Sequence, residues 1–307
     1  MAINWYPGHM HKARKKIKEA MPEIDLVIEV LDARIPYSSE NPLIDELRQD
    51  RPCIKILNKS DLADPQVTKL WLEFLEKEQG VKALALTSTQ RGQIRKLPEL
   101  CKKLVPNKST GIKPIRTMIM GIPNVGKSTI INILAGKTIA KTGNEPAVTK
   151  HQQRIDLGSG IVLSDTPGFL WPKIHDQNSA YRLAVSGAIK NTAIQFEDIA
   201  LFAAHYLLAT YPELLATRYK LKQMPETDIK LLEEIGRKRG GLRAGGNIDL
   251  HKASEVLLHD YRSGVLGCIS LERPEDIPPE EELLPDDTDE GKGDDEVNGT
   301  DKQANNP

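Results

Sequence analysis

The segment Gly121–Ser128 constrains the fold of this chain more than any other, because it reads Gly-Ile-Pro-Asn-Val-Gly-Lys-Ser. In a phosphate-binding loop of this pattern, backbone N–H groups surround the phosphates, Lys127 reaches the β and γ oxygens, and the Ser128 hydroxyl binds Mg²⁺. Chance produces the pattern in about one chain in a hundred of this size. Here an apolar run at 115–120 precedes it and a helical pattern at 129–135 follows it. The sequence therefore predicts a strand, a phosphate loop and a helix.

Further short apolar runs, each followed by a polar loop, predict more strands of the same sheet. They lie at residues 26–31, 54–57, 81–86, 155–157 and 161–163, and a helix is expected at 65–79. Alternating strands and helices indicate an α/β fold with a mainly parallel sheet, whose ligand lies at the carboxyl ends of the strands.

The segment Asn58–Asp61 reads Asn-Lys-Ser-Asp and follows one of these strands. The Asp61 carboxylate can accept hydrogen bonds from N1 and N2 of guanine, a pattern that adenine cannot reproduce. Asn58 can contact the other edge of the base, and the stem of Lys59 can pack along the ring. Thr87 and Ser88, after the next strand, are expected to support the base. Together these residues predict a guanine nucleotide, GTP or GDP.

The segment Asp165–Gly168 reads Asp-Thr-Pro-Gly and carries little information alone. At a strand end after a phosphate loop, Asp165 is expected to hold Mg²⁺ through water, and the Gly168 N–H to contact the γ-phosphate. Thr149, between the two motifs, is the candidate switch threonine that completes Mg²⁺ coordination. The remaining candidate nucleotide-binding residues are Ser60 of the guanine segment and, in or directly after the phosphate loop, Asn124, Val125, Gly126 and Thr129.

The order of these motifs is unusual. GTPases ordinarily place the phosphate loop first and the guanine-recognition segment after it, whereas here Asn58–Asp61 precedes Gly121–Ser128. A fold whose termini lie close together can be cut at another loop without changing its contacts. The sequence therefore predicts a circularly permuted, Ras-like P-loop GTPase domain.

Charge and patterning divide the chain into four predicted parts. Residues 272–307 contain 14 acidic and 3 basic residues, whereas residues 1–271 have a net charge of +10. A basic body fits a polyanionic partner, and the acidic, aromatic-free tail is expected to be disordered. Helical patterns at 199–211, 228–237 and 250–262 predict a separate helical domain. The expected parts are a basic extension at 1–22, the GTPase domain at 23–178, the helical domain at 179–271 and the tail at 272–307.

The chain resembles the ribosome biogenesis GTPase A family, the YlqF-type circularly permuted GTPases. The matching segments are Trp5–Met10, Asp32–Pro36, Asn58–Asp61, Gly121–Thr129, Pro146–Thr149, Asp165–Gly168 and the Arg- and Gly-rich segment that ends at Leu266-Gly267. The resemblance covers roughly residues 1–270. Two positions depart from it, because the family usually has glycine at Ala147 and often phenylalanine at Tyr6.

The resemblance implies a cytoplasmic factor that binds the large ribosomal subunit, its rRNA and its proteins, late in assembly. GTP hydrolysis would be stimulated by that subunit and followed by release. An alternative is an RNA-binding assembly factor whose hydrolysis is incidental. Three well-separated cysteines argue against a disulfide scaffold. No apolar run approaches 18 residues, so no membrane span is expected, and nothing indicates an obligate oligomer.

Hydrolysis needs a group that orients the attacking water, but Phe169 stands where many GTPases place glutamine. In the resembling family the proposed catalytic residue is the histidine of the Pro-Gly-His-Met segment, here His9. The alternative is that this segment is a docking strap. Asn124 resembles the asparagine that binds K⁺ in potassium-activated GTPases, which makes K⁺ a further candidate cofactor. The alternative for Asn124 is a hydrogen bond within the loop.

Two basic clusters are candidate rRNA contacts, since phosphate binding needs only clustered positive charge. For each, the alternative is a solvated surface. The candidates are Lys12, Arg14, Lys15 and Lys16 near the N-terminus, and Arg237, Lys238, Arg239 and Arg243 in the glycine-rich segment of the helical region.

Overall fold

The computed structural model describes residues 8–109, 113–140, 153–158, 160–171, 174, 176–189, 195–242 and 246–279, without the side chains of 8–12 and 109. Contacts group Met1–Ile277 into one compact unit, separate from Pro278–Pro307. Residues 280–307 of the expected acidic tail lie outside the described residues, whereas residues 272–279 are described and include the buried Glu272. The boundaries expected at 22, 178 and 271 stay predictions.

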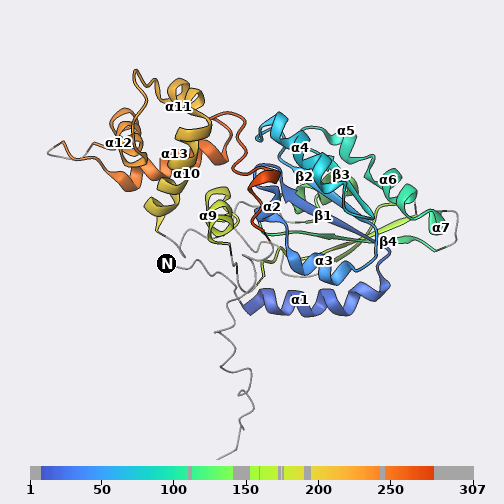
Figure 1. Cartoon of the computed structure of the whole chain (residues 1–307). Coiled ribbons are helices and arrows are strands. Elements are labelled where there is room, and N and C mark those ends of the chain that lie inside the picture. Colours follow the sequence, from blue (N-terminus) through green and yellow to red (C-terminus); the bar gives the residue numbers. More distant parts are fainter. Residues whose placement is uncertain are drawn as a thin grey trace, which may run out of the picture. The chain divides into compact units, whose positions relative to one another are not determined.

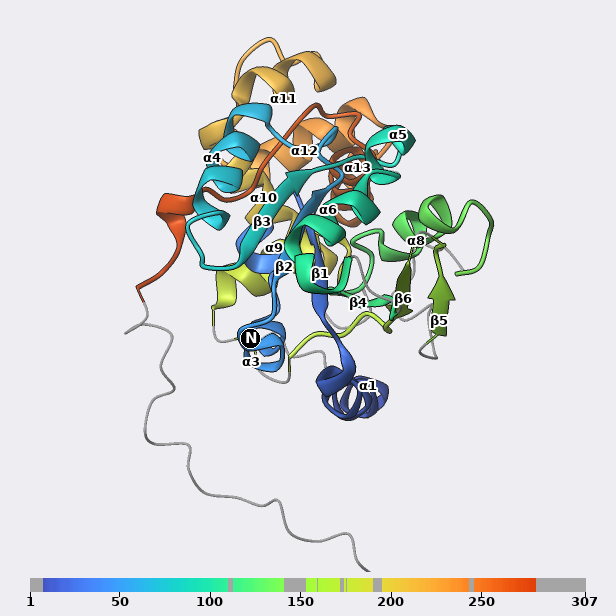
Figure 2. The same cartoon turned by 90° about the vertical axis from the view of Figure 1, so that its right-hand side faces the viewer.

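A six-stranded sheet forms the centre of the fold, in the order β3-β2-β1-β4-β6-β5 (Figures 1 and 2). All neighbours are parallel except the antiparallel pair of β5 and β6 at one edge. The strands are β1 (Leu26–Asp32), β2 (Cys53–Asn58), β3 (Val81–Ala85), β4 (Ile115–Met120), β5 (Gln153–Asp156) and β6 (Ile161–Asp165). The α/β sheet and its mainly parallel pairing confirm the fold class predicted from the sequence.

Helices connect the strands and cover the sheet. They are α1 (Gly8–Ala20), α2 (Pro36–Ser39), α3 (Pro42–Arg48), α4 (Pro65–Leu75), α5 (Arg91–Ile94), α6 (Leu97–Leu104), α7 (Pro106–Ser109) and α8 (Lys127–Ala135), with the 3₁₀ turns η1 (Met21–Glu23) and η3 (Pro274–Asp276). The four- to eight-residue helices α2, α3, α5, α6 and α7 were not expected, because so few turns give no clear periodicity. The helix expected at 65–79 begins at Pro65, capped by the Asp64 carboxylate, and ends at Leu75.

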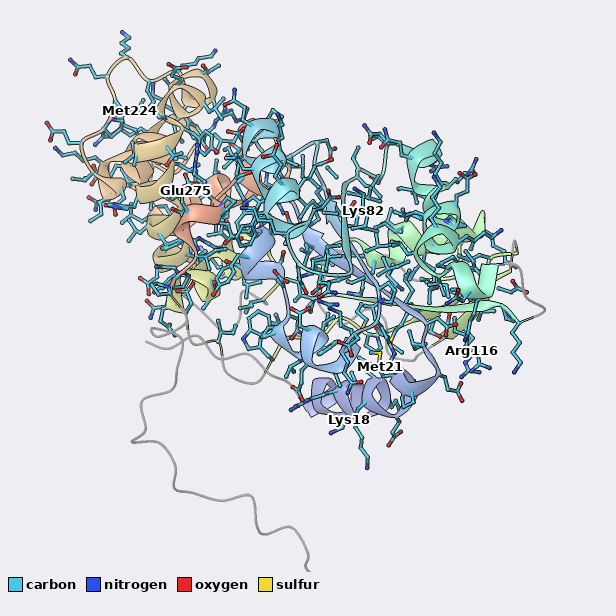
Figure 3. The ribbon with its side chains drawn as sticks, turned by 45° about the vertical axis from the view of Figure 1, so that its right-hand side comes forward. Lys18, Met21, Lys82, Arg116, Met224 and Glu275 are labelled. Atoms are coloured by element: carbon cyan, nitrogen blue, oxygen red, sulfur yellow. The ribbon has the colours of Figure 1, made fainter. Side chains whose placement is uncertain are left out.

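Helix α1 lies against the sheet through one face. Ala13, Ile17 and Met21 recur every four residues and are buried, and each buried side chain of this size contributes about 1–3 kcal/mol through the hydrophobic effect. Figure 3 shows Lys18 projecting from the outer side of α1. Lys15, Lys16 and Lys18 are exposed on this outer side.

The helical region expected after residue 179 consists of α9 (Gln177–Ser186), α10 (Phe196–Thr210), α11 (Pro212–Tyr219), α12 (Asp228–Lys238) and α13 (Leu250–Arg262). Small side chains on α10, among them Ala200, Ala203 and Ala204, are fully buried, which lets α12 and α13 approach closely. In the described part of the chain no single helix is long and apolar enough to cross a membrane; only α10 and α11 together, bent by 110°, meet that test.

Candidate functional site

The register of the sheet brings the predicted motifs to one edge. Asp32 pairs with Asn58 at the ends of β1 and β2, and Ile119 pairs with Asp165 where β4 and β6 end. The phosphate loop leaves β4 one residue later. Segments separated by more than 100 residues therefore meet at the carboxyl ends of neighbouring parallel strands, as expected for this sheet type.

The loop Gly121–Ser128 has the backbone of a phosphate cradle. Gly121, Asn124 and Gly126 all have positive φ, at 140°, 61° and 97°, which turns successive N–H groups toward one side. At Gly121 a Cβ atom would lie 2.4 Å from the carbonyl oxygen of Val30. Only glycine fits there, so the close approach of the loop to β1 explains this residue.

Lys127 is buried at the base of this cradle. Its Nζ donates hydrogen bonds to the carbonyl oxygens of Gly121 and Ile122, both at 2.8 Å. Burial lowers the pKa of Lys127 to about 8, and the nearby Asp165 carboxylate opposes that shift. A phosphate group would stabilise the charged ammonium in the same way.

Asp165 is buried and neither carboxylate oxygen has a partner among the described residues. Burial raises its pKa to about 6, and Lys127 opposes the rise. A buried carboxylate that keeps both oxygens unpaired beside a phosphate loop has the chemistry of a ligand for Mg²⁺. The predicted Mg²⁺ site therefore fits the residues present at this position.

The segment Asp165–Gly168 also contacts the phosphate loop. A Cβ atom at Gly168 would lie 2.9 Å from Cα of Pro123 and 3.0 Å from Nζ of Lys127. The Thr166 hydroxyl donates to the carbonyl of Ile119 at 2.8 Å. Only glycine therefore fits between the segment and the loop.

The guanine-recognition segment Asn58–Asp61 lies beside the loop. The Asn58 side-chain N–H donates to the carbonyl of Val125 at 2.6 Å, while Asn58 Oδ1 is buried without a described partner. The N–H of Ser60 donates to the carbonyl of Leu86 at 3.1 Å. This bond places Asn58–Asp61 next to Thr87 and Ser88, whose support of the base stays a prediction.

Asp32 and Arg34 form a buried ion pair at this edge. The Asp32 carboxylate accepts from Nε and Nη2 of Arg34 at 2.9 and 2.8 Å, and from Nζ of Lys59 at 2.8 Å. The two cations hold the pKa of Asp32 well below its usual range, although burial acts in the opposite direction. The contact with Lys59 was not expected, and the only sequence signal for it is the position of Asp32 at a strand end.

The other predicted residues are placed as follows. His9 belongs to the first turn of α1, and the side chains of His9 and Lys12 lie outside the described residues, as do Thr149 and Arg243. Lys15 and Lys16 are exposed, and Arg14 lies 3.8 Å from Glu46.

The exposed cations of the second basic cluster bond within the helical region. Arg237 pairs with Glu233 and Glu234. Lys238 donates to the carbonyl of Lys220, and Arg239 donates to the carbonyl of Arg218.

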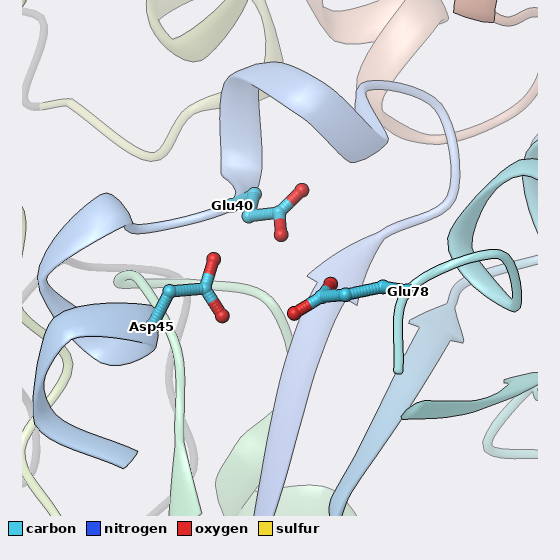
Figure 4. Close-up of side chains that lie close together, drawn as sticks. All are labelled: Glu40, Asp45 and Glu78. Atoms are coloured by element: carbon cyan, nitrogen blue, oxygen red, sulfur yellow. The ribbon is translucent and has the colours of Figure 1, made fainter. Parts of the chain in front are cut away.

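A second charged cluster lies further back along β1 and β2. Glu40, Asp45 and Glu78 point toward one another (Figure 4), and burial raises the pKa of the neighbouring Glu29 to about 8. The ammonium of Lys55 contacts Glu40 and Glu78, which places a cation among the carboxylates. This arrangement indicates a structural ion-pair network rather than a metal site.

The fold and these loops define the class of the protein: a P-loop GTPase whose strands are circularly permuted. A family model described as 50S ribosome-binding GTPase matches residues 116–230. A relative from Bacillus licheniformis named ribosome biogenesis GTPase A is 46% identical over 284 residues, which are 90% of this chain and 100% of that protein. The chain therefore belongs to the ribosome biogenesis GTPase A family, and it is a GTP hydrolase.

Solved structures agree with this assignment. The GDP-bound structure of TM YlqF is 30% identical with a TM-score of 0.62, covering 85% of this chain and 100% of that one. The GNP-bound structure of YlqF from T. maritima is also 30% identical, with a TM-score of 0.61 and coverage of 87% and 100%. Binding of GTP and GDP and a role in ribosome assembly follow from family membership.

Proposed function

We propose that this GTPase binds the large ribosomal subunit, promotes a late step of its assembly in the cytoplasm, and hydrolyses GTP on the subunit before release. The observation that supports this most is the meeting of the phosphate loop, Asp165 and the guanine segment at one edge of the sheet, together with the exposed Lys15 and Lys16 of α1. The match to a model described as 50S ribosome-binding GTPase supports the choice of the large subunit.

The phosphates of GTP bind the cradle of the phosphate loop in this proposal, supported by Lys127 and by the backbone from Asn124 to Thr129. Ser128, Asp165 and Thr149 would hold Mg²⁺. When bound, Mg²⁺ draws negative charge from the β- and γ-phosphate oxygens. Lys127 adds a second positive charge at the same oxygens, and the Gly168 N–H donates to the γ-phosphate.

Guanine selectivity belongs to Asp61, whose carboxylate accepts from N1 and N2 of the base. Asn58 offers its unpaired Oδ1 to the other edge, while its amide N–H keeps contact with Val125. The ion pair between Lys59 and Asp32 holds the lysine stem beside the ring. Replacing Asp61 by asparagine exchanges one carboxylate oxygen, an acceptor, for an amide NH2 group, a donor. The Asp61→Asn variant is therefore expected to prefer xanthosine over guanosine nucleotides.

Water activation requires a residue other than Phe169. Phe169 is fully buried, and its carbonyl accepts from the Asn41 side chain at 3.0 Å, so its ring packs in the core. We assign the catalytic role to His9, at the start of α1. The His9→Ala variant should lose about 100-fold of subunit-stimulated turnover and keep its GDP affinity. His11→Ala is the matched control.

Asn124 is the proposed K⁺ ligand. Its side-chain N–H donates to the carbonyl of Gly187 at 2.8 Å, which orients the amide, and amide oxygens are typical ligands of alkali cations. Turnover should therefore be faster in K⁺ than in Na⁺ at equal ionic strength, and Asn124→Ala should remove that difference. Equal rates of the wild type in both salts would contradict the assignment.

The rRNA contacts are assigned to Lys12, Arg14, Lys15 and Lys16, and to Arg237, Lys238, Arg239 and Arg243. Their charges would contact phosphates, so affinity should fall steeply with salt.

The deciding experiment measures GTP turnover in K⁺ buffer with purified large subunits, with small subunits as the control. Strong stimulation by large subunits alone is the expected result. Stimulation by small subunits, or equally fast turnover without subunits, would overturn the proposal. Binding to large subunits without any stimulation would instead favour an RNA-binding factor whose hydrolysis is incidental.

A further inference from the structure

The segment after α13, Gly264–Leu271, runs along the guanine-recognition loop, and we call it the α13 strap. Its residues Leu266, Ile269, Ser270 and Leu271 are almost completely buried. No motif in the sequence marks the strap as part of the nucleotide site. Its position beside the loop results entirely from tertiary folding.

Three hydrogen bonds join the strap to the second half of the guanine-recognition loop, residues Asp61–Asp64. The N–H of Ile269 donates to the carbonyl of Leu62 at 2.9 Å. The thiol of Cys268 donates to the carbonyl of Asp61 at 3.4 Å. In the third bond, the N–H of Asp64 donates to Oγ of Ser270 at 3.2 Å.

Tyr211, between α10 and α11, fastens the strap to the same loop. Its hydroxyl lies 3.2 Å from two acceptors, Oδ2 of Asp64 and the carbonyl of Ser270. It also accepts from the N–H of Ser270 at 3.3 Å. One hydroxyl therefore connects the helical region, the strap and the loop.

A second connection reaches Lys59 through β1. The N–H of Leu271 donates to the carbonyl of Arg34 at 2.8 Å, and the Arg34 guanidinium lies 4.8 Å from the centre of the Tyr261 ring. Arg34 in turn holds Asp32, the carboxylate that binds Lys59.

The two halves of the loop depend on different supports. Asn58 and Ser60 bond to the phosphate loop and to the carbonyl after β3, so the sheet itself fixes this half. The backbone carbonyls of Asp61 and Leu62 are bonded by the strap. A misplacement of about 1 Å can remove most of the effect of a positioned group, so the hold of the strap on these two carbonyls bears on where Asp61 lies.

We propose that the α13 strap and Tyr211 position Asp61 for guanine, so that Tyr211, Cys268 and Ser270 are positioning residues for base selectivity. This inference rests on the proposed role of Asp61 in reading the base. It predicts that removing a strap contact lowers the preference for guanine more than it lowers phosphate binding.

The test compares the affinities for GDP and for inosine diphosphate, which lacks the 2-amino group of guanine. Tyr211→Phe should lower the affinity for GDP about fivefold, the loss expected for about one hydrogen bond. It should lower the affinity for inosine diphosphate less. Cys268→Ala, at an exposed position, should act in the same direction with an effect of about twofold. It keeps the test decisive if Tyr211→Phe does not fold. Tyr181→Phe is the matched control, because Tyr181 stacks on Phe202 in the helical region.

The Asp61→Asn variant separates the two proposals. If Asp61→Asn does not come to prefer xanthosine over guanosine nucleotides, the proposed role of Asp61 in reading the base is overturned. If it does, but the ratio of the GDP and inosine diphosphate affinities is unchanged in Tyr211→Phe and Cys268→Ala, the positioning role is overturned and the guanine site stands. A lower ratio in either folded variant, with Tyr181→Phe unchanged, supports the inference.

Discussion

The phosphate half and the base half of the nucleotide site are held by different kinds of contact. The phosphate half comes from one continuous segment, in which β4, the loop and α8 follow each other over residues 115–135. The base half is the loop after β2, whose second part, Asp61–Asp64, bonds to Tyr211 and the α13 strap, about 150 to 210 residues away in sequence.

The two halves therefore differ in how far along the chain their supporting residues lie. The phosphate loop carries its own geometry in its glycines, so it keeps its shape wherever the chain is cut. Only the Asp61–Asp64 part of the guanine loop bonds to the helical region and the strap. In the proposed arrangement, a partner that displaced the helical region would displace the strap and the base half, and by reciprocity nucleotide binding would change the affinity for that partner.

The largest effect is expected for a change inside the phosphate half. Lys127→Ala should lower GTP turnover by about 100-fold or more, because it removes a buried positive charge from the phosphate oxygens. Turnover and GDP binding by titration calorimetry measure this. Lys137→Ala, an exposed lysine beyond α8, should behave like the wild type, and equal losses in both variants would contradict the local role of Lys127.

A change at the centre of the base half should act mainly on stability. Asp32→Asn leaves the Arg34 and Lys59 cations without their counter-charge, and breaking a buried ion pair lowers the free energy of unfolding by about 3 kcal/mol. Chemical denaturation measures this, with the exposed Asp50, changed to Asn, as the control.

The pH dependence gives a second readout of the same pair. The folded-state pKa of Asp32 lies below its usual value, so the pair stabilises the fold above about pH 4 and loses this contribution as the pH falls further. The wild type and Asp32→Asn should therefore converge in stability on acidification. A constant difference down to pH 2 would contradict this account.

A glycine pair tests the contact between the two halves. Gly126→Ala would place a Cβ atom 2.3 Å from Nδ2 of Asn58, at φ +97°. We expect about a tenfold loss of GDP affinity, because an unsatisfied or displaced Asn58 costs roughly 1–3 kcal/mol. Gly136→Ala has a similar positive φ of +67° but meets no atom within 4 Å, so it should lower stability alone. Similar affinity losses in both variants would trace the effect to backbone strain.

The smallest effect on nucleotide binding is expected for the basic side of α1. Exchanging Lys15 and Lys16 together for alanine should leave GDP affinity unchanged and weaken large-subunit binding several-fold at low salt, with a shallower salt dependence. Filter binding at several KCl concentrations measures this. An unchanged salt slope would place the subunit contact elsewhere.

The sequence by itself determined the phosphate half. Gly121, Gly126, Lys127 and Ser128 lie within eight residues, so their spacing reflects a geometry that forms locally. Apolar runs before each motif likewise sufficed for the parallel sheet, and the order of the motifs sufficed for the permutation, because strand ends of such a sheet share one edge.

Only the tertiary structure decided what holds the base half and where Phe169 lies. The contacts of Tyr211, Cys268 and Ser270 with the guanine loop join segments separated by about 150 to 200 residues, and no local pattern encodes such pairings. The sequence marked Asp32–Pro36 only as a segment that matches the family, and the contacts of Asp32 with Lys59 and of Arg34 with Tyr261 appear only in the structure. The spacing of nearby residues determines a site that one loop can form by itself. The contacts that hold such a loop in place come from the packing of distant elements, which the spacing does not determine.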